Sequence, residues 1–359
     1  MIEIHNSRNV TFTSSSRGMG LLNGQGYTWW WSNILQVSLK LRPELLHWQN
    51  CSQLLIENIK LKDSPRFNLN LHDVSDVIVR YVDIETDLDA QRKLHKMVND
   101  WRKWVEKALV DLNIPTFPLN TDGIDLKGRN IHIHDCSIVN YDDIIVPKPC
   151  DNKCMQTDCT ENILIENIEA RGVGMSIGSV PPSVHHYCVN NVTFRNVSLE
   201  SPLKGIYIKT DPGDEGSATI SNITFENFRI NRPLWWAIWI GPQQQHQPGW
   251  NWTEHQECAL DWPLGKKSKS HCMTNKNVAI EDIVLKDVVI DSPLLSPGVI
   301  LCNQTRFDNA TAPSCSRLTF QNVTVTGLST NLPFGRQYFC QNVEHSHSTK
   351  SDPSPSCFN

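Results

Sequence analysis

The chain has 359 residues, a formal net charge of −5 at pH 7 and a hydrophobic fraction of 39%. This length suffices for one large domain or two ordinary ones with a substantial core. The slight acidity, without any long run of like charge, argues against nucleic acid or an anionic membrane as a partner. No apolar run approaches the roughly twenty residues that a bilayer-spanning helix needs.

The covalent chemistry of the sequence indicates secretion. Twelve cysteines, several of them in the Cys150, Cys154 and Cys159 series, are too many to remain free thiols in a chain this polar. Zinc is the alternative, but His and carboxylate partners at zinc-ligand spacing are missing, so we expect disulfides and no metal or other cofactor. Acceptor sequons for N-glycosylation, which turn chemistry could also generate, occur at Asn9, Asn50, Asn191, Asn196, Asn222, Asn251, Asn303, Asn309 and Asn322.

The N-terminus starts directly in IEIHNSRNVTF, without the basic and apolar regions of a signal peptide. For a secreted protein this means either a truncated N-terminus or a leader that lies upstream. We expect an extracellular protein whose signal peptide is not part of this chain.

A self-similar phrase recurs along the chain and predicts the fold. Examples are IHIHDCSIVN, ILIENIEARG, VTFRNVSLES and ITFENFRINR, which start at residues 131, 163, 192 and 223, at intervals of 32, 29 and 31 residues. Each phrase has two short strands separated by Asn or Asp, and a third strand such as GIDLKG or GIYIKT follows. Short strands at a fixed period, with no helical pattern between them, predict an all-β fold, a right-handed parallel β-helix. Leucine-rich repeats have similar periods, but their Leu-x-x-Leu-x-Leu frame is absent.

The expected domain is this single β-helix over residues 1–335. Its alternation predicts a set of inward-facing side chains, namely Ile124, Leu126, Ile144, Val146, Ile177, Ile206, Ile208, Ile238 and Ile240. A polar C-terminal extension, residues 336–359, should be closed by Cys340 and Cys357. Cys258 and Cys272 should bridge a loop insert at about 242–276, and the Cys150 series should supply at least one more disulfide.

One segment departs from the strand pattern. Residues 89–112, within an insert at about 88–113, carry apolar side chains at three- and four-residue steps, which predicts an amphipathic α-helix. It comes immediately before NTDGID, so it is either a lid over a cleft or a helix that packs on the flank of the solenoid. Trp101 or Trp104 beside the acidic residues would indicate the lid.

Four carboxylates fall within two short motifs, NTDGID and YDD, and they are the candidate catalytic groups: Asp122, Asp125, Asp142 and Asp143. Each motif opens a strand-like run, so neighbouring parallel strands about 4.8 Å apart would gather the carboxylates on one solvent face. Crowded carboxylates repel, which raises at least one pKa and places an acid beside a base. Turn chemistry is the alternative, because Asp and Asn favour turns.

The order and spacing of five motifs resemble glycoside hydrolase family 28, the polygalacturonase family. They are GLLNGQGYTWW at 20–30, NTDGID, YDD, GVGMSIGS at 172–179 and IYIKT at 206–210, and the resemblance runs from Gly20 to Cys315. It implies an inverting hydrolase of pectin or a related acidic cell-wall polysaccharide. Asp142 would be the general acid, Asp122 and Asp143 would activate water, Asp125 would support them, and Asn120 would bind substrate. Inversion calls for carboxyls about 6.5–9.5 Å apart.

Two positions depart from that family's pattern. Val173 stands where the family has a histidine, and Tyr207 stands where it has an arginine, while Lys209 retains the lysine that binds the uronate carboxylate. One lysine lacks the bidentate fork of arginine. By alternation Tyr207, Lys209 and Trp239 face outward, so the two aromatics would offer stacking faces to a sugar, unless this Trp-rich coil only caps the sheet.

These observations leave two functions open. The expected one is hydrolysis of a polysaccharide substrate by a monomer, with rhamnose-containing or modified pectin among the candidate substrates. The alternative is a catalytically weakened β-helix that binds cell-wall or matrix glycans, favoured by the missing histidine and arginine. A lyase is disfavoured, because proton abstraction beside a uronate would use an Arg or Lys base and calcium, which the paired Asp motifs do not suit.

Overall fold

In the computed structural model the described residues are 1–27, 29–30, 42–88, 118–150, 154, 159–245, 258, 262–263, 272–309, 311–328 and 335–358. All 21 elements defined within these ranges are β-strands, which confirms the predicted all-β class. The predicted helix over residues 89–112, with Trp101 and Trp104, lies outside the described residues. Within them, no helix has the length and apolar character to cross a membrane.

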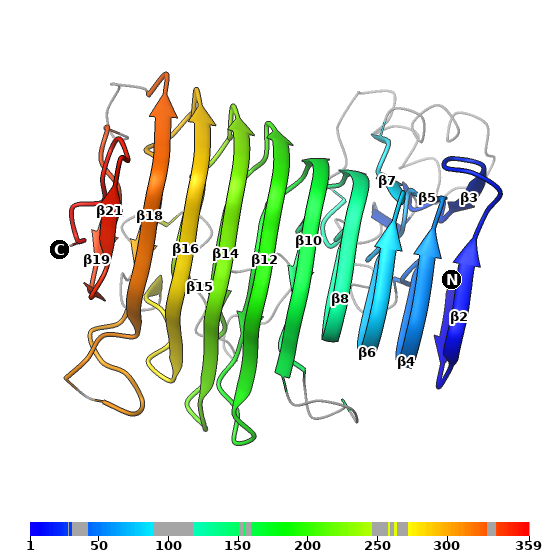
Figure 1. Ribbon diagram of the computed structural model, residues 1–359, viewed down its shortest axis with the longest axis horizontal. Helices are drawn as coiled ribbons and strands as arrows, with labels where there is room; N and C mark the ends of the chain where they lie inside the picture. Colours follow the sequence, from blue (N-terminus) through cyan, green and yellow to red (C-terminus); the bar gives the residue numbers. More distant parts are fainter. Residues whose placement is uncertain are drawn as a thin grey trace, which may run out of the picture.

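The body of the protein is a row of long parallel strands, each paired with the next one along the chain. Figure 1 shows them side by side, from β2 at the N-terminal end to β18 near the C-terminal end. Their bounds are β2 (Arg8–Thr13), β4 (Leu46–Glu57), β6 (Leu69–Arg80), β8 (Ile124–Val139), β10 (Cys159–Arg171), β12 (Tyr187–Glu200), β14 (Ala218–Asn231), β16 (Val278–Asp291) and β18 (Cys315–Thr326). Their in-register stacking is the predicted solenoid.

Each long strand bends where the sequence phrase has Asn or Asp. In β12 the bends fall at Asn191 and Asn196, with φ of 53° and 55°, a left-handed conformation that Asn tolerates better than most residues. The amide of Asn191 donates a 2.8 Å hydrogen bond to Asn162 Oδ1 of the previous coil, and Asn196 donates likewise to Asn167 at 3.1 Å. These stacked amides explain why Asn recurs between the strand segments.

A second row of short strands closes the coils and carries the candidate site. We call it the cleft sheet: it comprises β1 and the N-terminal parts of β4, β6 and β8, followed by β9, β11, β13, β15, β17 and β19. The bounds of the separate strands are β1 (Ile2–His5), β9 (Ile145–Pro147), β11 (Met175–Val180), β13 (Ile206–Thr210), β15 (Ile238–Gln243), β17 (Gly298–Leu301) and β19 (Phe339–Gln341). The cleft sheet therefore runs along the solenoid axis.

Two further groups of strands complete the ends. Near the N-terminus, β3 (Gly20–Asn23), β5 (Ile59–Lys62) and β7 (Asp83–Glu85) pair in turn and join β8. At the C-terminus, β20 (Val343–Glu344) and β21 (His347–Thr349) pair with β18, and β19 pairs with β17. The segment predicted as a polar extension after residue 335 therefore adds strands to the solenoid through backbone pairing.

One hydrophobic core fills the interior, and alternation predicted most of it. The side chains that were predicted to face inward and that belong to this core are Ile124, Leu126, Ile144, Ile177, Ile206, Ile208, Ile238 and Ile240. Val146 was predicted wrongly. Ile145 pairs with Ile124 and Met175 and joins the core, which moves Val146 to the outer face opposite Asp125.

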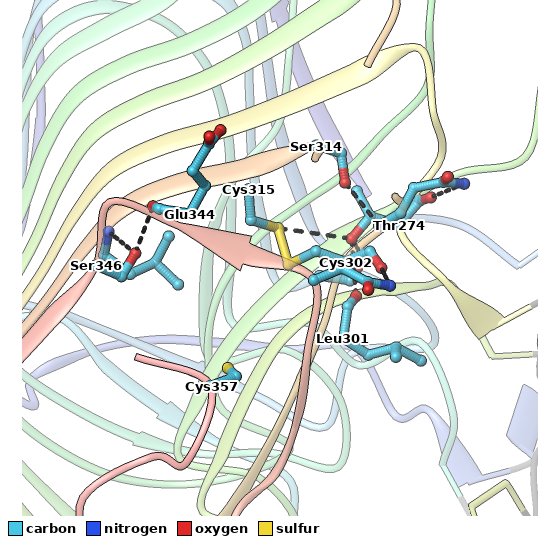
Figure 2. Close-up of a disulfide and its surroundings, with 12 residues drawn as sticks. Thr274, Leu301, Cys302, Ser314, Cys315, Glu344, Ser346 and Cys357 are labelled. Atoms are coloured by element: carbon cyan, nitrogen blue, oxygen red, sulfur yellow. Dashed lines mark hydrogen bonds between the residues drawn. A yellow bond between two sulfur atoms is a disulfide. The ribbon is translucent and has the colours of Figure 1, made fainter. Parts of the chain in front are cut away.

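Five disulfides are present among the described residues. The predicted Cys258–Cys272 and Cys340–Cys357 pairs are confirmed, with Cα atoms 4.5 and 5.5 Å apart. The Cys150 series supplies Cys150–Cys154 and Cys159–Cys188. A fifth disulfide that the sequence did not single out, Cys302–Cys315, lies beside Thr274, as Figure 2 shows. Cys51 and Cys136 are buried free thiols.

Candidate active site

A pocket of about 310 Å³ lies on the outer face of the cleft sheet. It crosses successive coils, from the turn before β6 to the end of β15. The described residues that line it are Arg66, Phe67, Asn120, Asp122, Asp142, Asp143, Lys148, Gly178, Ser179, Pro181, Lys209, Asp211, Pro212 and Gln244. The two acidic motifs therefore meet at the middle of a cleft that runs parallel to the solenoid axis.

The structure brings three of the four predicted carboxylates within reach of one another. One oxygen each from Asp122, Asp142 and Asp143 lies within 4.8 Å of the others. All four acids are at most 8% exposed, and Asp122, Asp142 and Asp143 line the floor of the pocket, so the open solvent face expected from the sequence is not what the structure shows. Their oxygens also approach more closely than the separation of about 6.5–9.5 Å expected for an inverting pair.

Strand pairing explains this short distance. The amide of Gly123 donates a 2.9 Å hydrogen bond to the carbonyl of Asp143, so Asp122 and Asp143 occupy adjacent strands. Adjacent strands lie about 4.8 Å apart. A Cβ atom on residue 123 would lie 2.3 Å from the carbonyl oxygen of Ile144, so only glycine permits this approach. The glycine of the NTDG motif is therefore what allows the acids to meet.

Asp143 is held in its ionised form. Lys209 Nζ donates to Asp143 Oδ2 at 2.7 Å, and Ser176 Oγ donates to Asp143 Oδ1 at 2.6 Å. Burial alone would raise the pKa of Asp143, but the positive charges of Lys209 and Lys148 together with these two hydrogen bonds outweigh it and lower the pKa below its ordinary value. Lys209 keeps its proton for the same reason: Asp143 offsets the cost of its burial and raises its pKa.

Asp125 has its own cationic partner, Lys148. The ammonium of Lys148 forms an ion pair with Asp125 Oδ2 and lies 3.5 Å from Asp122 Oδ2. Burial would lower the pKa of Lys148, yet the nearby carboxylates of Asp125 and Asp122 raise it overall. Lys148 therefore remains positive between two acids.

Asp142 and Asp122 are the acids with raised pKa values. Burial, and then the charge of Asp143, raise the pKa of Asp142, although its oxygens accept backbone hydrogen bonds from Asn120 (2.8 Å) and Asp143 (2.9 Å). Burial, with the charges of Asp125 and Asp142, raises the pKa of Asp122 well above its ordinary value. Asp122 Oδ1 is buried and has no hydrogen-bond partner among the described residues.

Charge balance accounts for this division. The four carboxylates cluster with two ammonium groups: Lys209 pairs with Asp143, and Lys148 pairs with Asp125 and more loosely, at 3.5 Å, with Asp122. The pKa values of Asp122 and Asp142 rise. The site thus combines an acid of lowered pKa, Asp143, with two acids of raised pKa, which is the arrangement that proton transfer requires.

Asn120 lies at the pocket wall, where the sequence placed a substrate-binding residue. Its side-chain oxygen accepts a 2.7 Å hydrogen bond from Arg42, and its backbone amide donates to Asp142. Arg42 is buried and also donates to the carbonyls of Leu119 (2.5 Å) and Pro65 (3.2 Å). Burial and the nearby Arg66 lower the pKa of Arg42 to about 10. Arg42 therefore fixes the loop that orients Asp142.

The aromatic stacking faces predicted from the sequence are not formed. Tyr207 and Trp239 do occupy outward positions of the cleft sheet, but Tyr207 is 3% exposed and Trp239 is fully buried. Trp236 and Trp262 pack beside Trp239, and the ammonium of Lys204 lies 3.9 Å from the Tyr207 ring centroid. These rings form a second, smaller core on the outer face, so sugar does not reach them in this conformation.

Lys148, Ser176 and Phe67 are among the site residues that the sequence analysis missed. The prediction that Val146 faces the interior implied that Lys148 also points inward. In the structure the register is shifted by one residue, and Lys148 faces outward. Ser176 was recoverable from the Met175–Ile177 alternation. Phe67 lines the pocket from the turn before β6, and no motif pointed to it.

Among the described residues, two groups of side chains have the spacing to hold a metal ion. In one of them Cys150 and Cys154 are disulfide-bonded and cannot act as thiolate ligands. The other is the trio of Asp122, Asp142 and Asp143. Both oxygens of Asp143 already accept strong hydrogen bonds, and the other two acids have raised pKa values, so this donor set suits proton transfer better than a cation.

Comparisons with known proteins agree with the geometry. A family model described as glycosyl hydrolases family 28 matches residues 3–258. A probable polygalacturonase of Arabidopsis thaliana is 28% identical over 222 residues, which cover 60% of this chain and 39% of that protein. The endo-xylogalacturonan hydrolase A of Aspergillus tubingensis is 26% identical over 236 residues, which cover 64% of this chain and 49% of that protein. This chain therefore spans less than half the length of either relative.

Solved structures share the architecture. The crystal structure of the endo-xylogalacturonan hydrolase from Aspergillus tubingensis superposes with a TM-score of 0.58 at 19% identity, covering 99% of this chain and 79% of that one. The polygalacturonase from Erwinia carotovora gives 0.54 at 21% identity, with 96% and 74% covered. At such identities the likeness establishes the fold, and it confirms the predicted parallel β-helix.

Proposed function

This chain belongs to glycosyl hydrolases family 28, and on that basis we propose that it hydrolyses glycosidic bonds in pectin or a related acidic cell-wall polysaccharide, with inversion. The observation that carries the proposal is the pocket in which Asp142 and Asp122 have raised pKa values while Asp143 is held ionised. A cleft along the solenoid axis fits an extended polymer. The five disulfides are in keeping with an extracellular site of action.

Asp142 is the proposed general acid. Its raised pKa favours the protonated form that a general acid needs, and the two backbone amides that hold its oxygens fix the carboxyl in one orientation. In the reaction, Asp142 gives its proton to the glycosidic oxygen as the bond to the anomeric carbon breaks. The neighbouring Asp143 stays negative and stabilises the positive charge that develops on the sugar ring.

Asp122 is the proposed general base. Its Oδ1 has no hydrogen-bond partner among the described residues and can accept one from a water molecule. The raised pKa of Asp122 makes its ionised form a better proton acceptor. Both oxygens of Asp143 already accept hydrogen bonds, so Asp143 helps to orient the water and Asp122 takes its proton. Lys148 keeps Asp122 from becoming so basic that it stays protonated.

The spacing of the carboxyl groups and the family resemblance predict different stereochemical outcomes. A separation below about 5.5 Å is typical of retaining enzymes, whereas the family resemblance implies inversion. We propose inversion because Asp122 and Asp143 act together on one water above the pair, which does not require a gap between acid and base. The anomer released in the first turnover distinguishes the two outcomes.

The experiment that tests the proposal is a reducing-end assay over a panel of pectic polysaccharides and over a broad pH range. We expect new reducing ends from at least one uronate-containing polymer, and we expect Asp142→Asn to abolish them. Absence of cleavage from every polymer would contradict the proposal.

A second candidate function rests on Val173 and Tyr207, which replace the family's histidine and arginine. It is the binding of cell-wall glycans without turnover. Tyr207 has no guanidinium to offer the carboxylate of a sugar, and its ring is buried against Lys204. Saturable binding of a polymer that the protein does not cleave would favour this function over hydrolysis.

A further inference from the structure

The loop that joins β17 to β18 is fixed at its base. The Cys302–Cys315 disulfide closes it, and Figure 2 shows this bridge beside Ser314 and Thr274. The backbone amide of Asn303 donates to Ser314 Oγ at 2.8 Å, and the amide of Ser314 donates to the carbonyl of Asn303 at 3.0 Å. Figure 1 shows the loop, in orange, projecting beyond the end of β18. The loop therefore presents its outer residues to solvent from a defined base.

The outer part of the loop is held as well. Arg306 and Asn309 exchange two backbone hydrogen bonds, of 3.3 and 3.2 Å, which form a tight turn. The Arg306 guanidinium donates to Asp308 at 2.8 Å within the turn and to Glu281 of β16 at 3.2 Å. None of these four residues is among those that line the candidate active-site pocket. Chemistry at this loop is therefore separate from the proposed hydrolysis.

Two of the N-glycosylation sequons lie in this loop, and they begin at Asn303 and Asn309. Each asparagine forms an Asx turn, in which its side-chain oxygen accepts hydrogen bonds from the backbone amide and the hydroxyl of the threonine two residues on. The distances are 3.0 and 2.8 Å from Thr311 to Asn309, and both are 3.3 Å from Thr305 to Asn303. Donation to the amide oxygen stabilises negative charge on the amide and so favours the loss of a proton from Nδ2. Because the turn spans only three consecutive residues, it can form before the coils stack, when a transferase meets the new chain.

The two sequons differ at the side-chain nitrogen, which is the atom that takes the sugar. Nδ2 of Asn303 donates to the carbonyl of Thr274 at 3.3 Å, and Asn303 is half-buried. Asn309 is exposed, and its Nδ2 has no hydrogen-bond partner among the described residues. A sugar on Asn303 would displace the contact with Thr274, whereas a sugar on Asn309 extends into solvent.

Four further sequons lie where the coils bend. At each of them Nδ2 donates to an Asn or Asp oxygen of the previous coil, at distances between 2.7 and 3.3 Å. Coils stack about 4.8 Å apart, so a sugar linked to such a nitrogen would crowd the neighbouring stacked side chains. Stacking therefore disfavours modification at these positions. We call them the stacked sequons: Asn191, Asn196, Asn222 and Asn322.

We propose that Asn309 is N-glycosylated in a eukaryotic secretory pathway, in preference to Asn303 and to the stacked sequons. In this step Nδ2 of Asn309 forms a bond to the anomeric carbon of the first sugar, and the bond from that carbon to the diphosphate of a lipid-linked oligosaccharide breaks. The diphosphate leaves with the bonding electrons, and the proton that Nδ2 loses balances the new charge. The five disulfides are in keeping with passage through an oxidising secretory compartment.

Mapping the occupied sequons of the secreted protein tests the proposal. The full chain is expressed in yeast behind a secretory leader, and an N-glycosidase in heavy-oxygen water then converts each glycosylated asparagine into a labelled aspartate. Peptide mass spectrometry gives the occupied fraction at each position. We expect a higher occupied fraction at Asn309 than at Asn303 and at every stacked sequon. An occupied fraction at Asn303 or at any stacked sequon that equals or exceeds that at Asn309 overturns the proposal, as does an unmodified Asn309.

Two matched substitutions in the same loop sharpen the test. Asn309→Gln should remove one glycan from the intact mass of the secreted protein, whereas Asn303→Gln should leave the number of glycans unchanged. The readout is the number of glycans per molecule, so a lower yield of Asn303→Gln, which loses the contact with Thr274, does not affect it. An unchanged glycan number in Asn309→Gln, or the loss of a glycan in Asn303→Gln, would contradict the assignment.

Discussion

The outer face of the cleft sheet has two halves built on the same backbone ladder. Toward the N-terminus its outward positions are polar, with His47, Asn70 and Asp125 in register. Toward the C-terminus they are apolar, with Tyr207, Trp239 and Val299 in register, and all three are buried. The backbone ladder is the same in both halves. The outward side chains alone therefore make one half an acidic pocket and the other half a second hydrophobic core.

This difference predicts a division of labour. Substitutions in the polar half should change turnover, pH dependence and specificity with little loss of stability, since the acids there are crowded and buried at a cost. Substitutions in the aromatic half should destabilise the fold with little direct effect on chemistry. The predictions below test that division, beginning with the largest effect.

Asp142→Asn keeps the shape of the general acid but removes its proton. Loss of general-acid assistance typically costs about 10²–10⁴-fold, so kcat should fall by that factor while the affinity for polysaccharide persists. Initial rates and isothermal titration on the same preparation provide the measurement. Asp291→Asn, at an exposed position of β16, serves as the matched control and should behave like the parent. An Asp142→Asn variant with near-normal kcat would remove Asp142 from the mechanism.

Trp239→Ala should have the largest effect on stability. Truncation of a fully buried tryptophan leaves a cavity and costs about 3–5 kcal/mol of unfolding free energy. Chemical denaturation monitored by circular dichroism measures it, with Phe307→Ala, 41% exposed, as a control expected to change little. If Trp239→Ala folds as stably as the parent yet loses glycan affinity, then Trp239 is a sugar platform and the two halves are not divided as described.

The sequence predicted the fold where alternation was regular. In β13 the pattern IYIKT placed Ile206 and Ile208 inside and Tyr207 and Lys209 outside, as the structure shows. It failed at DDIIVPKP, because Ile144 and Ile145 both enter the core and shift the following residues by one. An alternating pattern cannot show that two successive residues both point into the core. The resulting one-residue shift is the reason the sequence analysis missed Lys148.

Burial of the aromatics could not be predicted for a different reason. Strand alternation correctly assigned Trp239 to the outer face. Its burial, however, depends on Trp262 and on the Cys258–Cys272 disulfide, which lie in the insert that follows β15. Likewise, the acids were identified by their motifs, whereas the sequence does not show which lysine reaches which carboxylate. Such pairings follow from packing in three dimensions.

Lys148→Met should change the pH dependence of turnover. Lys148 lowers the pKa of Asp122, so its removal raises that pKa further. The base is active only when ionised, so the acid limb of the kcat/KM profile should move up by about one pH unit, with rates near the parent optimum falling about tenfold. Lys127→Met, on the neighbouring strand position, is the control. An unshifted acid limb would show that Asp122 is not the base.

Asp122→Asn should stabilise the protein slightly while abolishing turnover. The pKa of Asp122 is raised in the fold, so the folded state is favoured below the ordinary pKa and loses that advantage as pH rises through the raised value. Asparagine has no carboxyl to ionise, so the Asp122→Asn variant does not lose this stability as the pH rises. We expect a gain of about 1 kcal/mol near neutral pH and none in strong acid. A variant that is less stable than the parent at neutral pH would show that Asp122 contributes to folding.

The most direct test of the whole account is a proton NMR time course of the parent with the pectic polysaccharide that gives the most new reducing ends in the panel assay. The first reducing ends to appear should carry the anomeric configuration opposite to that of the cleaved bond, and should equilibrate only later by mutarotation. That result would establish hydrolysis with direct attack of water activated by Asp122 and Asp143. Product of unchanged configuration, or no new reducing ends from a polymer that the protein demonstrably binds, would contradict the account.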